Sequence, residues 1–274
     1  MKLRIVKPSQ GLFWVRQGLL MARKQPFNLV GLLGMVACAA LLLIGLPIVG
    51  PLLVVGLMPI VWMGFMLATR RALAGERVTP SVFIEPLRSA DSPRQAFAKL
   101  GGAYVLATLV VMQLAQLLGP GAEVLSEAFE AAKDTGEVLA NPLVQQDVLW
   151  RMGLTLPVSL LFWHTPALVL WARMPVGKAL FFSAVASWRN LGAFTVYGLA
   201  WGGVMVLLGL VTQLLGGLLG EPTVVSVLAL SMGMWVAASF YASLYFTVID
   251  CFDAPDADPN DQADKRVTPS SGQA

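Results

Sequence analysis

Residues 27–69 read FNLVGLLGMVACAALLLIGLPIVGPLLVVGLMPIVWMGFMLAT and contain no Asp, Glu, Lys or Arg. This run is about twice the ~20 residues that a helix needs to cross the hydrocarbon of a bilayer. It is interrupted by Gly45-Leu46-Pro47 and by Gly50-Pro51, and proline removes a backbone donor and restricts the residue before it. The run therefore predicts two membrane-spanning helices, near 28–46 and 51–69, with a tight turn between them.

Four further uncharged runs continue the same pattern. They predict helices near 101–119, 152–172, 193–216 and 223–249. Hydrophobic residues make up 57% of the 274 residues and charged residues 13%, and the mean hydropathy is +0.71. A soluble domain has too little interior to bury that apolar fraction, so lipid is the expected solvent. The predicted fold is an all-α polytopic membrane protein whose six spans form three hairpins.

The distribution of basic residues predicts the orientation. Of the 19 lysines and arginines, all but Lys133 and Arg151 fall on one side of the predicted membrane. Positive loops stay in the cytoplasm, so we expect a protein of the bacterial inner membrane with both termini inside. The formal net charge of +3 reflects this bias and gives no reason to expect nucleic-acid binding.

The chain divides into three predicted segments. Residues 1–26 contain six basic residues without a long apolar core, so they predict a cytoplasmic amphipathic segment and no cleavable signal peptide. Residues 27–250 form the transmembrane domain. Residues 251–274 are rich in Asp and Pro and are expected to be a disordered cytoplasmic tail. The two cysteines, Cys38 and Cys251, are placed for neither a disulfide nor a metal framework.

Two stretches before spans are predicted to be interfacial helices. The first stretch lies within residues 1–26, before the first span. One face of its helix is apolar and consists of Leu12, Val15, Leu19 and Ala22. Its basic residues lie on other faces, and this arrangement suits the interface of an anionic leaflet. Residues 181–190 resemble this first stretch. The candidate contacts to anionic lipid headgroups are Arg16, Arg23, Lys24, Arg70, Arg71 and Arg189.

Residues 121–136 are predicted to form an acidic amphipathic helix on the outer side. Its apolar face is Val124, Leu125, Ala128, Phe129 and Ala132, and its acidic face is Glu123, Glu127, Glu130 and Asp134. A row of carboxylates could hold a divalent cation, but the segment has no histidine and no loop that gathers ligands. We therefore expect a solvated acidic face and no metal site.

Polar residues inside the membrane are the remaining place to look for function. No charged side chain lies near the middle of a predicted span. The one histidine, His164, precedes Thr165-Pro166, where a proline kink beside an imidazole could make a ligand or proton site. Equally, a neutral imidazole can hydrogen-bond between helices as part of the packing. The candidate intramembrane polar residues are Ser159, His164, Thr165, Ser239, Tyr241 and Ser243.

The polar residues of the last span also allow two interpretations. Ser231, Ser239, Ser243 and Thr247 follow a helical spacing that could line a wet path. The same spacing is typical of a helix–helix seam, because Ser and Thr can hydrogen-bond their own backbone and permit close approach.

Short segments resemble a family of uncharacterised six-helix inner-membrane proteins of bacteria. They are 71–76 (RALAGE), 165–169 (TPALV), 178–183 (KALFFS) and 189–194 (RNLGAF). The hairpin layout is also similar to the membrane domain attached to some glycerophosphodiester phosphodiesterases. The resemblance implies a six-helix membrane fold and no activity, because that family has no established catalytic or binding residues to carry over.

Two functions follow from these observations. The sequence has no GxxxxGK[ST], GxGxxG, HExxH or GxSxG segment, so we predict no catalytic, cofactor-binding or metal residue and no enzyme. The first function is an accessory or scaffold protein that binds lipid, a membrane-protein partner or a second copy of itself. The alternative is a permease or channel-like transporter of a small solute that uses the intramembrane polar residues.

Overall fold

The computed structural model describes residues 2–88, 93–132 and 135–252. In these residues, six helical segments are long and apolar enough to cross a membrane, which confirms the predicted all-helical membrane protein. The spans are α2 (Pro26–Ile44), α3 (Val49–Leu73), α5 (Arg94–Leu118), α8 (Pro142–Phe162) continued by α9 (Thr165–Trp171), α11 (Leu191–Leu219) and α12 (Pro222–Cys251). The shorter elements are α1 (Gln10–Lys24), η1 (Pro80–Phe83), α4 (Glu85–Arg88), α6 (Ala122–Ala131), α7 (Thr135–Ala140) and α10 (Val176–Arg189).

Several helices begin earlier than their apolar runs. Helix α5 begins at Arg94 without a side-chain cap, whereas α8 begins at Pro142, where a side-chain cap sets the start. The Asn141 side chain accepts a hydrogen bond of 2.9 Å from the backbone N–H of Leu143, and Pro142 takes the first helical position, where its missing N–H costs nothing. The tail predicted to be disordered lies, from residue 253 onward, outside the described residues.

The turn predicted between the first two spans lies between Ile44 and Val49. Gly50 is required there, because a Cβ at this position would lie 1.8 Å from the carbonyl oxygen of Leu43. Ile48 adopts a φ of 62°, a conformation that is rare for a β-branched residue. The glycine and the strained turn bring α2 and α3 into direct contact.

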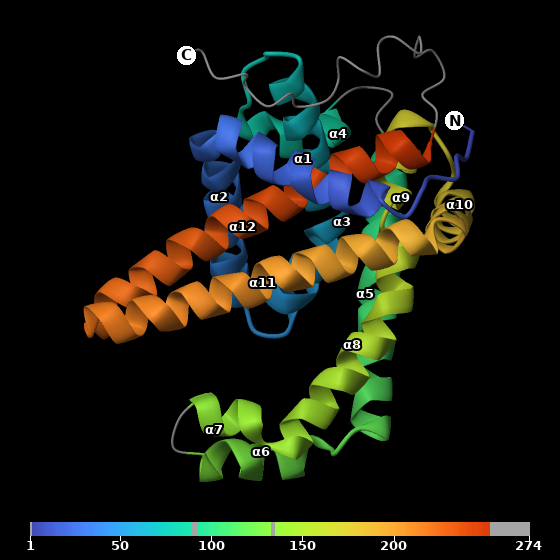
Figure 1. The fold of residues 1–274 in the computed structure, drawn as a ribbon. Coiled ribbons are helices and arrows are strands. Elements are labelled where there is room, and N and C mark those ends of the chain that lie inside the picture. The colour runs from blue at the N-terminus through green and yellow to red at the C-terminus, as the bar shows by residue number, and fades with distance from the viewer. Residues whose placement is uncertain (1, 89–92, 133–134, 253–274) are drawn as a thin grey trace, which may run out of the picture.

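Consecutive spans pack on each other: α2 on α3, α5 on α8, and α11 on α12. Figure 1 shows α11 and α12 running side by side, away from α5 and α8, so that the two pairs end far apart. We call them the α11–α12 arm and the α5–α8 arm. Helices α6 and α7 follow the far end of the α5–α8 arm and pack on α8.

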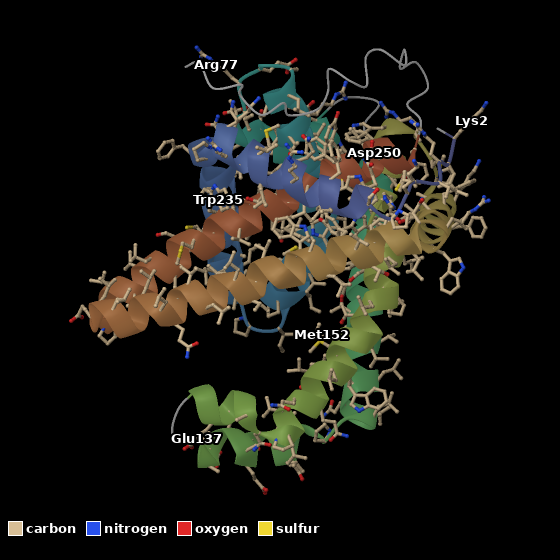
Figure 2. The ribbon with its side chains drawn as sticks, in the orientation of Figure 1. Lys2, Arg77, Glu137, Met152, Trp235 and Asp250 are labelled. Atoms are coloured by element: carbon tan, nitrogen blue, oxygen red, sulfur yellow. The ribbon has the colours of Figure 1, made fainter. Side chains whose placement is uncertain are left out.

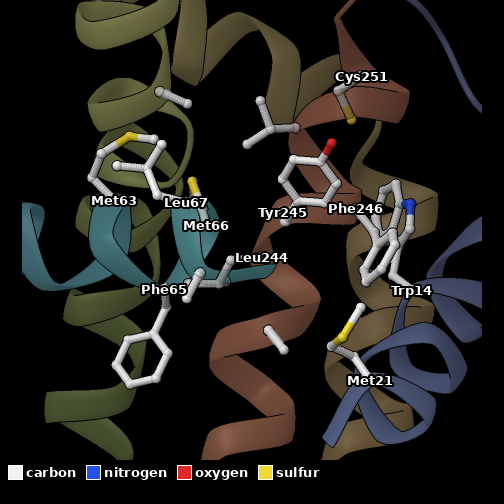
Figure 3. Close-up of a cluster of buried hydrophobic side chains, with 14 of the residues drawn as sticks. Trp14, Met21, Met63, Phe65, Met66, Leu67, Leu244, Tyr245, Phe246 and Cys251 are labelled. Atoms are coloured by element: carbon white, nitrogen blue, oxygen red, sulfur yellow. The ribbon is translucent and has the colours of Figure 1, made fainter. Parts of the chain in front are cut away.

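The buried core lies where the arms meet. Helices α1, α4, α9 and α10 gather there together with the C-terminal ends of α3 and α12 (Figure 1). This region, which carries most of the basic residues, is called the basic end (Figure 2). Its largest fully buried side chains include Trp14, Met63, Phe65, Phe97 and Phe246; Figure 3 shows part of this cluster. The outer part of the α11–α12 arm, by contrast, is apolar and exposed.

Helix α1 packs closely on both α11 and α12. A Cβ at Gly11 would lie 2.2 Å from the carbonyl oxygen of Ala193, and a Cβ at Gly18 would lie 2.4 Å from that of Ser239. These two residues are seven positions apart and therefore share one face of α1. Their missing side chains permit backbone contact of the kind that small residues give membrane helices.

The face of α1 that packs differs from the one expected. Val15 and Ala22 are buried, but Leu19 is half-buried and Leu12 is 59% exposed. The contact is centred on the glycines and on Trp14, whose ring packs against Phe194 at 5.4 Å between centroids. The helix is thus part of the core along this face, and its basic residues remain on the outside.

The α1 contact predicts a large effect of Gly18→Leu. The added side chain would meet the backbone of α12, and overpacking of this kind typically costs about 1–3 kcal/mol. We expect a lower unfolding temperature in detergent and faster proteolysis within residues 2–24. The matched control is Gly31→Leu on α2, because a Cβ at Gly31 meets nothing within 4 Å. Equal stability of the two variants would contradict the packing described for α1.

Candidate functional site

The fourth span is broken beside the candidate histidine. Helix α8 ends at Phe162 and α9 begins at Thr165, because Pro166 has no N–H to continue the helical ladder. Irregular backbone at membrane depth is tolerated when its polar groups are bonded within the protein. The Thr165 hydroxyl supplies one such bond, donating to the carbonyl of Leu161 at 2.9 Å.

Helix α10 supplies the other bonds at this break. The backbone N–H of His164 donates to the Ser183 hydroxyl at 3.0 Å, and that hydroxyl donates to the carbonyl of Leu160 at 3.1 Å. The Ser187 hydroxyl donates to the same carbonyl at 3.2 Å. Two serines one helical turn apart on α10 therefore supply hydrogen-bond partners to backbone groups at the break, and these bonds hold α10 against the span.

The His164 ring is fully buried among aromatic side chains. Its centroid lies 5.6 Å from that of Phe194 and 5.3 Å from that of Phe252, with both rings near edge-on. Neither ring nitrogen has a hydrogen-bond partner among the described residues. The preceding Trp163 donates from Nε1 to the Thr247 hydroxyl at 3.1 Å. The backbone of Thr247 on α12 is the polar group that interacts with the ring. The imidazole is thus a buried polar group without a hydrogen bond of standard geometry, which is uncommon in folded proteins.

The other candidate polar residues face different neighbours. Ser239 donates to the carbonyl of Trp235 at 2.8 Å, and Ser243 to that of Phe240 at 2.6 Å. Tyr241 stacks on Phe65 of α3 at 4.7 Å between centroids, and Ser159 is half-buried on α8. No hydrogen bond or ring contact in the described chain joins His164 to Ser239, Tyr241 or Ser243. The structure brings only Thr165 beside His164, its neighbour in sequence.

Ser239 and Ser243 lie beneath Gly18 of α1. The Ser243 oxygen also lies 2.6 Å from the hydroxyl of Tyr197 on α11. The two serines therefore occupy a junction of three helices, where small polar side chains bonded to their own backbone permit close packing.

Sequence reasoning missed the role of Asp250. Its carboxylate Oδ2 accepts from Gln10 Nε2 at 2.5 Å and from Trp14 Nε1 at 2.8 Å, so it joins the end of α12 to α1. In the sequence, Asp250 stands at the boundary between the predicted transmembrane domain and the tail, and no role was predicted for it. Its position as the single acidic residue within α12 was the available signal, because a carboxylate inside a span needs partners.

The N-terminal arm, residues 2–9, is bound to the same region. The backbone N–H of Val6 donates to Asn190 Oδ1 at 2.8 Å, and Asn190 Nδ2 donates to the carbonyl of Arg4 at 3.0 Å. The N–H of Arg4 donates to the carbonyl of Cys251 at 2.8 Å. An isolated bridge pairs Leu3 with Phe252. These bonds bring both ends of the described chain to the basic end.

Five of the six candidate lipid contacts are available at the surface. Arg71 is the exception, because its Nη2 lies 2.5 Å from Glu85 Oε2 and its Nε lies 3.9 Å from Glu76 Oε2. The side chains that are exposed and form no ion pair with a described residue are Arg16, Arg23, Lys24, Arg70 and Arg189. Unpaired cations at a bilayer surface attract anionic headgroups.

The acidic segment is shorter than expected. Helix α6 ends at Ala131 rather than near 136, and a second short helix, α7, follows. Only Ala128 of α6 is buried, whereas Val124 and Phe129 of the predicted apolar face are exposed. The described residues contain no group of three His, Cys, Asp or Glu side chains placed to hold a metal ion.

Comparison with known proteins agrees with this architecture. The chain is 33% identical over 255 residues, covering 92% of its own length, to a probable inner membrane protein of Burkholderia thailandensis, of which the match covers 94%. The chain belongs to the family of that inner-membrane protein. No protein-family model and no solved structure matches it. An integral inner-membrane protein is thus established, and the relative's name states no biochemical role.

The serine bonds at the broken span predict the effect of Ser183→Ala combined with Ser187→Ala. The buried Leu160 carbonyl would lose both donors, and leaving a buried group unsatisfied costs about 1–3 kcal/mol. We expect a lower unfolding temperature and faster hydrogen exchange around 160–165. The control is Ser226→Ala, since this exposed serine bonds only its own helix. An unchanged exchange rate at the break would contradict the role given to α10.

Proposed function

We propose that this protein is a non-enzymatic accessory or scaffold protein of the inner membrane, which binds a span of another membrane protein along the α11–α12 arm. The observation that carries the proposal is the open glycine face of α11. At about 100° per residue, Gly198, Gly202, Gly209 and Gly216 fall on one side of this helix. A Cβ at any of the four would meet nothing within 4 Å.

The adjoining face of α11 is already used for packing within the chain. Phe194, Tyr197 and Trp201 are buried and contact α1 and α12. The glycine face lies beside this packed face: Gly198, Gly202 and Gly209 are exposed and Gly216 is half-buried, and Met205 and Gln213 are exposed next to them. Because lipid gives no hydrophobic drive to helix association, close backbone approach at small residues is what supports it. This face supplies such an approach over about five turns of helix.

The basic end supplies a second contact in this proposal. Its exposed arginines and lysines would bind anionic headgroups of the cytoplasmic leaflet, at about 1 kcal/mol for each cation near the surface. Contact with lipid at this end and with a partner along the arm would hold the partner at a fixed place relative to the membrane surface. We place both termini in the cytoplasm on the same charge bias.

A transporter is the second candidate, and the unpartnered imidazole of His164 favours it. Buried polar groups that lack partners can mark binding sites. Against this reading, the serines proposed to share the site bond to their own backbone, and Ser239 and Ser243 face α1. Coupled transporters generally carry charged residues near the midplane, whereas uncoupled transport needs none.

Crosslinking tests the accessory function. Cys38 and Cys251 are replaced by Ser, and single cysteines are introduced at Gly202 or Met205 for photocrosslinking in native membranes, followed by mass spectrometry. We expect one other polypeptide to be captured stoichiometrically from these positions. The matched control is a cysteine at Leu106, an equally apolar exposed position on α5, which should capture lipid alone. Capture of the same polypeptide from both helices, or of none from α11, would contradict the proposal.

The variant His164→Ala separates the two candidates. In an accessory protein, it should leave partner capture from position 202 intact and change stability only modestly, because the ring nitrogens make no hydrogen bond of standard geometry. In a transporter it should abolish uptake of the solute. Loss of uptake in cells, with the protein still present in the membrane at its usual level, would favour transport.

A further inference from the structure

Helix α10 lies across the spans at the basic end. Figure 1 shows it almost along its axis, while α11 and α12 are seen from the side. It contacts α8, α9 and α11, and its inner face is bound through Ser183 and Ser187 to the broken span. The contacts of the inner face therefore determine the direction in which the outer face of α10 points.

That outer face carries large apolar side chains at helical spacing. Phe181 and Trp188, seven residues apart, are 63% and 74% exposed, and Val185 lies between them on the same face. Trp is the residue most enriched at the headgroup level of bilayers, because an apolar ring and one N–H donor suit that boundary. The ring contact recorded for Phe181 is with the neighbouring Phe182 of the same helix, at 5.8 Å between centroids, so within the described chain no other element covers this face.

Exposed cations surround this face. Lys178 and Arg189 lie on α10 itself, and the N-terminal arm adds Lys7, which directly follows the residue bonded to Asn190. The arm is held close to α11, since a Cβ at Gly192 would lie 3.3 Å from the Pro8 ring. None of these three cations forms an ion pair with a described residue.

Among the residues that the structure describes, few acids offset the charge of this corner. The sequence has no Asp or Glu in residues 1–75 or 148–220, which include the arm, α1, α9, α10 and α11. Within residues 2–88, 93–132 and 135–252, the carboxylate that reaches the arm and α1 is Asp250, which is buried and already accepts from Gln10 and Trp14. The field at the corner therefore favours an anion.

We propose that the outer face of α10 and the N-terminal arm form a binding surface for an anionic phospholipid. Lys7 and Arg189 bind the headgroup phosphate, and Phe181 and Trp188 lie against the glycerol and upper acyl region. The inference deepens the lipid contact of the proposed function and rests on it, but it is separate from the partner contact along α11.

Native mass spectrometry tests the proposal with phosphatidylglycerol as the probe. The full chain is reconstituted in nanodiscs of phosphatidylglycerol and phosphatidylcholine, released into mild detergent, and the lipid that remains bound is counted. We expect the wild type to retain phosphatidylglycerol selectively. Lys7→Glu with Arg189→Glu should abolish this selectivity, because each cation removed weakens binding about fivefold and each acid added repels the phosphate. Trp188→Ala should reduce retention with all charges in place.

The matched control is Arg77→Glu with Arg88→Glu, which reverses the same number of exposed charges in the connection between α3 and α5. It should keep the selectivity of the wild type. Equal losses in both double variants would overturn the proposal, since a general cationic rim would then explain retention. Selective retention that appears only after removal of residues 253–274 would also overturn it, by making the acidic tail the occupant. Partner capture from position 202, measured in the same variants, reports separately on the proposed function.

Discussion

The backbone contact of α1 with α11 and α12 is the constraint on which the rest of the structure depends. Gly11 and Gly18 permit it, and any side chain at either position would overlap main-chain atoms. The approach places Trp14 where its indole N–H reaches Asp250, so that an acid in the last span is paired rather than left alone in an apolar core. The same approach sets Ser239 and Ser243 beneath α1 and Tyr197 beside them. A helix that precedes the first span thus joins the last two.

A consequence of this arrangement is the unequal packing of the two ends of the molecule. Buried side chains concentrate where α1, α9 and α10 meet the spans, and the arms beyond them contact little except their own pair (Figure 1). In water, exposed apolar helices of this kind would be unstable. In a bilayer their exposure costs little free energy, because lipid covers apolar side chains as well as protein would. The packed end can therefore hold the arms in place while the arms keep faces open for other molecules.

The sequence predicted those features of the fold that depend on single residues and their spacing: the spans, the turn and the break. Uncharged runs of spanning length predicted the six spans, and the proline positions predicted the turn near Gly50 and the break near Pro166. Contacts between distant segments were not predictable in this way. The expected apolar face of α1 included Leu12, which is exposed in the structure. This prediction was wrong because the spacing of hydrophobic residues carries no signal of a contact made by glycines. Asp250 and Asn190 were missed because their partners, Trp14 and Val6, lie far away in sequence. Of the six candidate polar residues, His164, Thr165, Ser239 and Ser243 are buried; that the two serines face α1 and not His164 could not be read from their spacing.

The most direct test of the account is a distance measured between the two arms in nanodiscs. Spin labels at Leu117 on α5 and Leu218 on α11, both exposed, would be compared with labels at Leu218 and Val224 within the α11–α12 arm, after replacement of Cys38 and Cys251. We expect a short distance for the pair within the arm and a clearly longer one between the arms, well beyond the ~8–10 Å between axes of packed helices. Equally short distances for both pairs would show a closed bundle, and the open glycine face of α11 would then need a different explanation.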